Sequence, residues 1–144
     1  MSQSITSSNA ILMLGVKSLF ATPQQIQSFT ADDIFDTDDV DTSEIVMGLD
    51  GKLSAGYIPV AIKQNFTIMA NSASNSFFEA IYASEVAAKE KYWLFGVISL
   101  PSISRSYVLT SGIMTGYKPV PDAKKSLQPR KFSITWESIV SAPI

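Results

Sequence analysis

The side chains that could do chemistry in this chain are carboxylates, amines and hydroxyls, because its 144 residues include no histidine and no cysteine. A Ser-His-Asp triad, a thiolate nucleophile, a zinc finger and a His-ligated metal site are therefore excluded. Carboxylate pairs, a Ser-Lys dyad and an all-oxygen cation site remain open. No spacing in the sequence nominates a catalytic residue, so we expect neither enzyme activity nor a bound cofactor.

The densest group of carboxylates lies in an acidic loop that we expect over residues 27–44. Its members are Asp32, Asp33, Asp36, Asp38, Asp39, Asp41 and Glu44. An EF-hand loop counted from Asp36 needs glycine at position 41 and glutamate at position 47, where this chain has Asp41 and Met47. The stretch therefore predicts a solvated loop, or a strand with an exposed acidic edge, that faces a partner rather than a metal ion.

A basic group lies in a proline-rich loop expected over residues 118–131. It consists of Lys124, Lys125, Arg130 and Lys131. The net charge of −2 and the lack of interleaved aromatic residues favour a docking point for an acidic partner over a nucleic-acid site. Residues 1–72 carry three lysines and eight acids, a net −5, whereas residues 73–144 carry eight basic residues and five acids, a net +3. Opposite charges on two regions suit head-to-tail contact between copies.

The composition indicates what must hold these charged segments in place. With 46% hydrophobic and 17% charged residues, a chain of this length predicts one compact domain, residues 1–144, with a sizeable core. Residues 1–9 are expected to form a flexible arm. The apolar stretch Ala10–Val16 has seven residues before Lys17 and no basic residue before it, so we expect no signal peptide and no membrane insertion.

The first half of the chain predicts strands. Ala10–Phe20 is typical of a strand with a bulge at Gly15, closed by Thr22-Pro23. Glu44–Leu49 and Ala55–Lys63 flank Asp50-Gly51, a dipeptide that favours a tight hairpin turn, and Pro59 is expected at an edge or a strand start.

An alternating strand is predicted over Val60–Met69. It places apolar Val60, Ile62, Phe66 and Ile68 on one face and Lys63, Asn65 and Thr67 on the other, with Gln64 as its one break.

The second half predicts one helix and three strands. Ser76 and Glu79 form a capping-box pattern, and apolar spacing continues the helix over Phe77–Lys91 with Glu85, Lys89 and Glu90 on its exposed side. Tyr92–Leu100 is apolar at almost every position, which is typical of a central strand covered on both faces. Two further strands are predicted: Ile103–Thr115, with Tyr107, Leu109 and Ile113 on one side, and Phe132–Val140, which buries Phe132, Ile134, Trp136 and Val140.

This order of features resembles the tail tube proteins of contractile-tailed bacteriophages. The resemblance spans about residues 10–140 and rests on the Gly48–Gly51 hairpin, the alternating strand, the Ser/Asn turn, the aromatic-rich helix, the apolar strand, the proline loop and the closing strand Phe132-Ser133-Ile134-Thr135-Trp136.

The resemblance implies a mainly β fold with one α-helix, a β-sandwich or partial β-barrel that closes into a ring with other copies. Six copies would form each ring, and rings would stack into the inner tube of a virion's tail. That tube houses the tape measure protein, contacts sheath and baseplate proteins, and conducts DNA as transient, non-specific cargo. Related rings occur in type VI secretion and in phage-tail-like bacteriocins.

On this interpretation, some residues are expected at contacts between subunits or rings: Asp36, Asp38, Asp39, Asp41, Gly48, Leu49, Asp50, Gly51, Lys52, Lys124, Lys125 and Arg130. Others are expected to face a wet lumen: Lys63, Asn65 and Thr67. Three alternatives stay open: a tube initiator, terminator or baseplate component of the same fold, a small-ligand-binding β-barrel, and an enzyme.

Overall fold

The computed structural model describes residues 10–17, 19–27 and 35–143. The described part of the chain contains nine strands, one α-helix and a short 3-10 helix. In chain order they are β1 (Ile11–Val16), β2 (Phe20–Ile26), β3 (Phe35–Thr37), β4 (Ser43–Met47), β5 (Leu53–Tyr57), β6 (Ile62–Ile68), α1 (Asn75–Ala88), β7 (Leu94–Leu100), the 3-10 helix (Pro101–Ile103), β8 (Arg105–Tyr117) and β9 (Arg130–Pro143). The expected arm over residues 1–9 and residues 28–34 of the acidic loop lie outside the described residues.

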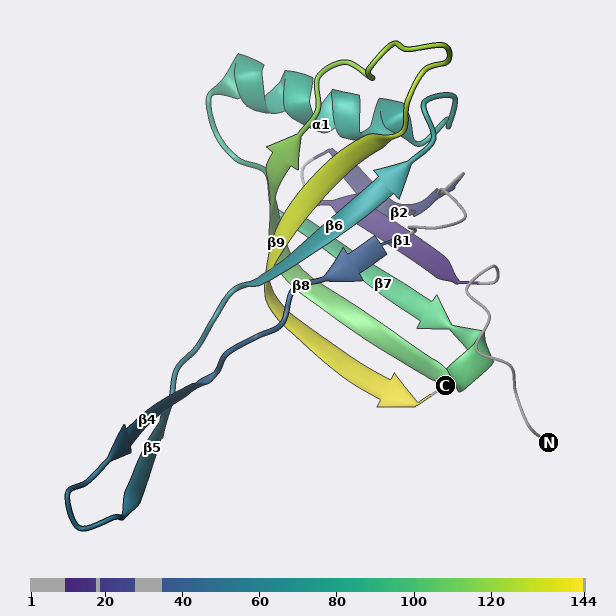
Figure 1. The fold of residues 1–144 in the computed structure, drawn as a ribbon. Helices are drawn as coiled ribbons and strands as arrows, with labels where there is room; N and C mark the ends of the chain where they lie inside the picture. The colour runs from purple at the N-terminus through teal and green to yellow at the C-terminus, as the bar shows by residue number, and fades with distance from the viewer. Residues whose placement is uncertain (1–9, 18, 28–34, 144) are drawn as a thin grey trace.

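Seven of these strands form one antiparallel sheet in the order β2-β1-β7-β8-β9-β6-β3, while β4 and β5 form a separate hairpin. Figure 1 shows the sheet curling round below helix α1 and the hairpin standing away from it. The expectation of a mainly β fold with one helix is confirmed. Of the two expected architectures, the partial barrel describes this single curved sheet.

The core lies between the inner face of the sheet and helix α1. Phe78 of the helix stacks on Phe132 of β9 with ring centroids 4.2 Å apart, and Tyr82 stacks on Tyr117 of β8 at 4.3 Å. The buried apolar side chains are Leu12, Leu14, Val16, Ile26, Phe66, Ile68, Phe77, Phe78, Ile81, Leu94, Ile98, Leu109, Met114, Phe132, Ile134 and Trp136. Each large side chain of this kind stabilises the fold by about 1.5–3 kcal/mol through burial.

The N-terminal strand differs from its predicted bounds. The pairing of β1 with β2 shifts register between Leu14 and Val16, but the extra residues lie on β2, and Gly15 pairs in regular register with Phe95 of β7, so the predicted bulge at Gly15 is wrong. The single strand predicted to end before Thr22-Pro23 is in fact two strands. The chain turns back after β1, and β2 runs through Thr22-Pro23. Pro23 is tolerated because β2 is the outermost strand of the sheet, where a missing N–H donor breaks no ladder. Pro59 lies between β5 and β6, outside both strands.

Helix α1 starts earlier than predicted, and the capping box is wrong. Ser74 is the N-cap, and Ser76 lies inside the helix with its Oγ donating to Ala73 O at 2.8 Å. Glu79 binds Arg130 instead of the helix terminus. Glu85, expected on the exposed side, is only 8% exposed and pairs with Lys91 at 3.1 Å. Glu85 is enclosed because the helix buries the side that carries Phe78, Ile81 and Glu85.

The predicted coverage of the later strands needs correction at three residues. Strand β7 lies inside the sheet between β1 and β8, but it is covered on one face only, and Val97 is 39% exposed. Strand β8 contains Ser111 with a φ of 51°, and the irregularity there places Leu109 in the core, whereas Ile113 is only half-buried. Strand β9 buries Phe132, Ile134 and Trp136 as predicted, but Val140 is 58% exposed.

Candidate assembly surfaces

The β4–β5 hairpin is the most exposed ordered part of the described chain. Its strands pair from Ser43 with Tyr57 to Met47 with Leu53, and every residue in both strands is exposed. Figure 1 shows it projecting beyond the sheet, with α1 at the far side. An isolated two-stranded hairpin is marginally stable in water, so a hairpin of this kind gains stability from a surface that covers it.

The tip of the hairpin brings together the five residues that were predicted as contacts there. Gly48 N donates to Lys52 O at 2.8 Å, Gly51 N donates to Gly48 O at 3.0 Å, and Asp50 Oδ1 accepts from Lys52 N at 3.1 Å. Gly51 has a φ of 83°, which favours glycine, as the Asp-Gly pattern predicts. Leu49 is fully exposed at the tip.

The hairpin has one apolar face. Residues opposite each other in an antiparallel pair share a face. Three such pairs lie on one face of the hairpin: Ser43 with Tyr57, Ile45 with Ala55, and Met47 with Leu53. The other face carries Glu44, Val46 and Ser54. We call Ile45, Met47, Leu53 and Tyr57 the hairpin apolar face; these side chains are 60–79% exposed.

The predicted acidic residues lie on the arm that leads into this hairpin. Asp36 is on the edge strand β3, where it accepts a hydrogen bond from Asn65 Nδ2 at 2.8 Å. Asp38, Asp39 and Asp41 follow in the connection to β4, and all three are exposed. The acidic stretch was predicted to be either a solvated loop or a strand with an exposed acidic edge. Residues 35–37 form such a strand.

The outer face of the sheet, opposite the core, is polar over β6 and the first half of β9. Lys63 pairs in register with Thr135, and Asn65 pairs with Ser133, whose Oγ donates to Asn65 Oδ1 at 2.7 Å. Lys63 is exposed and Asn65 is half-buried, but Thr67 is only 7% exposed. Thr67 is therefore a poor candidate for a lumen-facing residue, because the protomer already covers it.

The same outer face carries one apolar row across β1, β7, the first half of β8 and the last half of β9. The register pairs Met13 with Val97, Val97 with Val108, and Val108 with Val140, so these four side chains form one row across four strands. We call them the sheet apolar patch. Sequence reasoning missed it, because the continuous apolar run around Val97 was interpreted as a strand buried on both faces.

The basic loop lies at the α1 end of the molecule, whereas the hairpin projects from the opposite end (Figure 1). Lys124 and Lys125 are exposed in it. Arg130, which was predicted as a contact residue beside them, is instead 2% exposed. It opens strand β9 and points inward, so we withdraw it from the set of candidate surface contacts.

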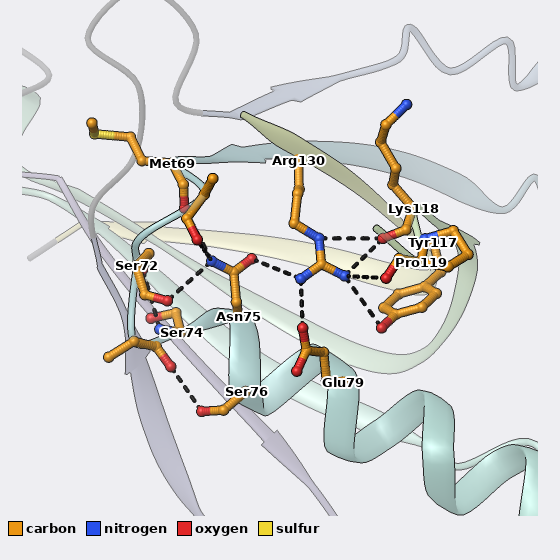
Figure 2. A network of polar contacts seen from close by, with 12 residues as sticks. Met69, Ser72, Ser74, Asn75, Ser76, Glu79, Tyr117, Lys118, Pro119 and Arg130 are labelled. Carbon is orange, nitrogen blue, oxygen red and sulfur yellow. Dashed lines mark hydrogen bonds and ion pairs between the residues drawn. The ribbon is translucent and has the colours of Figure 1, made fainter. Parts of the chain in front are cut away.

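Arg130 holds the base of that loop against the helix (Figure 2). Its Nη1 donates to Glu79 Oε1 at 2.7 Å and to Asn75 Oδ1 at 3.4 Å. Its Nη2 donates to the carbonyl oxygens of Lys118 at 2.7 Å and Pro119 at 3.3 Å. The guanidinium also lies over the Phe132 ring, 5.2 Å from its centroid. These contacts anchor both ends of the loop that carries the exposed Lys124 and Lys125.

Within residues 10–17, 19–27 and 35–143, no three or more acidic side chains come together as a metal site. In the same ranges, no helix is long and apolar enough to span a membrane. The surfaces that distinguish this molecule are therefore the hairpin, the acidic arm, the two halves of the outer sheet face and the basic loop.

A family model described as tail fiber protein gp32 matches residues 3–140. The chain belongs to this family. Among curated protein sequences, none matches the gp32 family member significantly.

Solved structures of similar fold come from contractile injection systems. The PVC sheath/tube terminator in its extended state is 10% identical, with a TM-score of 0.68 over 99% of this chain and 99% of that chain. A chain of the PVC sheath-tube complex is 11% identical, with a TM-score of 0.62 over 98% and 93%. The tube terminating cap of the anti-feeding prophage is 15% identical, with a TM-score of 0.63 over 100% and 94%.

The gp32 family member is thus a structural component of a phage-tail-like assembly, with the tube fold. The predicted resemblance to tail tube proteins is confirmed at the level of this fold and this kind of assembly. The similar chains include a sheath/tube terminator and a tube terminating cap as well as a chain of a sheath-tube complex.

Proposed function

We propose that this protein forms a ring at the end of the tube of a contractile tail-like system, as a terminator or cap, rather than the repeating tube subunit. The observation that carries this proposal is the likeness to the PVC sheath/tube terminator, which extends over 99% of both chains with a TM-score of 0.68. The tube terminating cap of the anti-feeding prophage has the same fold over the whole of this chain.

The surfaces of the protomer suit a ring. A ring of identical copies requires two different, complementary patches on each subunit, because each copy contacts its neighbours head to tail. The hairpin and the basic loop lie at opposite ends of the molecule, and the acidic arm next to the hairpin carries the opposite charge to Lys124 and Lys125. Asp38, Asp39 and Asp41 are therefore proposed to meet the basic loop of an adjacent subunit.

The polar half of the outer sheet face is the proposed lining of the channel. Lys63, Asn65, Ser133 and Thr135 present charged, amide and hydroxyl groups there. Such a surface stays wet without cover, whereas the sheet apolar patch on the same face gains free energy when it is covered. A terminator with this lining would contact the tape measure protein and passing DNA only transiently, while sheath and tube proteins would contact its rim.

The experiment is negative-stain electron microscopy of the purified full chain over a concentration series, with light scattering for mass. We expect single rings of constant diameter that do not stack at any concentration. Long hollow tubes would instead identify the repeating tube subunit. Monomers at every concentration would overturn the proposal that the chain forms rings by itself.

A further inference from the structure

An open groove lies beside the basic loop, at the end of the molecule opposite the hairpin (Figure 1). It has a volume of about 570 Å³ and lies between the turn that joins β6 to α1 and the last part of the loop. Met69 on the turn and Leu127 and Pro129 on the loop give it an apolar lining. Met69 is 44% exposed and Leu127 is 61% exposed, so the protomer leaves this lining uncovered. Apolar side chains gathered in a groove indicate an interaction site.

The groove has a basic rim. The loop turns back on itself over residues 123–127, the last two of which line the groove. Lys124 and Lys125 are exposed in this turn. The acid that precedes them on the loop, Asp122, is neutralised by Lys118, whose Nζ lies 3.1 Å from Asp122 Oδ2. Two positive charges therefore lie beside an uncovered apolar surface, and a complementary partner carries carboxylates together with apolar side chains.

The stalk that joins the hairpin to the sheet has this chemistry. It consists of residues 38–42, on the acidic arm, and residues 58–61, which lead back to β6. The stalk contains no basic residue but three exposed acids: Asp38, Asp39 and Asp41. Three apolar residues of the stalk are 38–40% exposed: Val40, Ile58 and Val60. The tip of the hairpin is a poorer match, because Lys52 follows Asp50 there and offsets its charge.

We propose that the stalk of one copy lies in the groove of the next copy in the ring, with its acids against Lys124 and Lys125. The occupant of the groove is thus a second copy of this chain. Stalk and groove lie at opposite ends of the molecule, so the contact is heterologous and links copies head to tail (Figure 1). This inference rests on the proposed ring and its charge pairing, and it adds the apolar seat that receives the stalk.

Charge reversal tests the contact from both sides. The stalk variant carries Asp39→Lys and Asp41→Lys, and the loop variant carries Lys124→Glu and Lys125→Glu; all four positions are exposed, so the core is untouched. We expect each variant alone to need a several-fold higher concentration to assemble at low salt, because its stalk and its groove rim carry like charges.

An equimolar mixture of the two variants should assemble at close to the wild-type concentration, because the stalk of each then meets the oppositely charged rim of the other. The control is the stalk variant mixed with chains carrying Lys17→Glu and Arg105→Glu, which have the net charge of the loop variant but change exposed sites outside the contact. This control mixture should not recover. Light scattering and electron microscopy measure assembly in each case.

A matched pair of substitutions tests the apolar seat. Leu127 in the groove is 61% exposed and Val86 on helix α1 is 58% exposed, so both can be replaced without opening the core. We expect Leu127→Ser to raise the concentration needed for assembly several-fold at high salt as well as at low salt, because apolar burial is not screened by ions. Val86→Ser should leave that concentration unchanged.

The outcomes separate this inference from the proposed function. Wild-type rings combined with a stalk-and-loop mixture that recovers no better than the control mixture would overturn the stalk-in-groove contact and leave the ring intact. Long tubes from the wild-type chain would overturn the terminator, while the same two mixtures still decide the contact. A wild-type chain and a stalk-and-loop mixture that both stay monomeric would overturn both.

Discussion

Nη1 of Arg130, at the start of β9, lies 2.7 Å from the Glu79 carboxylate in helix α1. The two residues are 51 positions apart in the sequence. Arg130 is 2% exposed and Glu79 is 54% exposed, so the ion pair joins a buried cation to the solvent-facing side of the helix. The other Arg130 donors bind carbonyl oxygens of the loop base, which makes this side chain the junction of strand, helix and loop.

Replacing this junction should destabilise the protomer. We expect Arg130→Met to lower the free energy of unfolding by about 2–4 kcal/mol, mainly because buried carbonyl oxygens lose their donor. The exposed Glu79 regains water and contributes little to the loss. Urea unfolding measures the change, and Lys131→Met, at the exposed neighbouring position, is the control. A loss below 0.5 kcal/mol, the usual effect of a surface substitution, would show that the network is not structural.

A second prediction concerns the one polar residue on the core face of β6. Gln64 Oε1 accepts a hydrogen bond from the indole Nε1 of Trp136 at 3.1 Å, and Gln64 Nε2 donates to Thr37 Oγ1 at 3.1 Å. Gln64→Met keeps the volume but leaves the buried indole donor without this acceptor. It should cost about 1–3 kcal/mol of stability in urea unfolding. Thr37→Ala, which removes only the outer, exposed partner, should cost far less, and equal losses would contradict this account.

A third prediction tests the close approach of β8 and β9. A Cβ added at Gly112 would lie 2.5 Å from Cζ3 of the Trp136 ring, closer than carbon atoms approach without a bond. Gly112→Ala should therefore lower the free energy of unfolding by about 1–3 kcal/mol, because the core has to shift. Gly56→Ala is the control, because a Cβ there meets nothing within 4 Å. Thermal unfolding of both variants at low protein concentration decides the point, and an unchanged midpoint for Gly112→Ala would refute it.

The fourth prediction concerns charge between subunits. Lys124→Glu combined with Lys125→Glu should reduce the yield of rings, or of rings bound to tubes, several-fold at low salt, because the proposed partners are acidic. The difference from wild type should shrink as salt is raised, since exposed charges are screened. Lys17→Glu combined with Arg105→Glu changes the net charge equally at exposed sites outside this contact. If both double variants behave alike, the specific pairing with the acidic arm is wrong.

Local patterns in the sequence predicted the elements of this fold well. The Asp50-Gly51 turn and the strand around Phe132 depend on neighbours within a few residues, so they can be read from spacing alone. The same is true of the exposed acids and of Lys124 and Lys125, since charged side chains are rarely buried.

The errors occurred where distant segments meet. Arg130 was placed on the surface with its basic neighbours, and Glu85 was placed on the exposed side of the helix. Arg130 is buried because its partners in helix α1 are far away along the chain. Glu85 is buried because of the way the helix packs on the sheet. No local pattern encodes either contact. The sheet apolar patch was missed for the converse reason, because an apolar run looks the same whether a neighbouring element covers both of its faces or only one.

The sequence by itself determined that this chain is β-rich, with charge separated along its length, because composition and periodicity constrain which surfaces can be buried. Only the tertiary structure decided which residues remain available for assembly. Burial depends on strand order and register, and the order β2-β1-β7-β8-β9-β6-β3 places exposed Val97, Val108 and Val140 in one row with half-buried Met13, while it encloses Arg130.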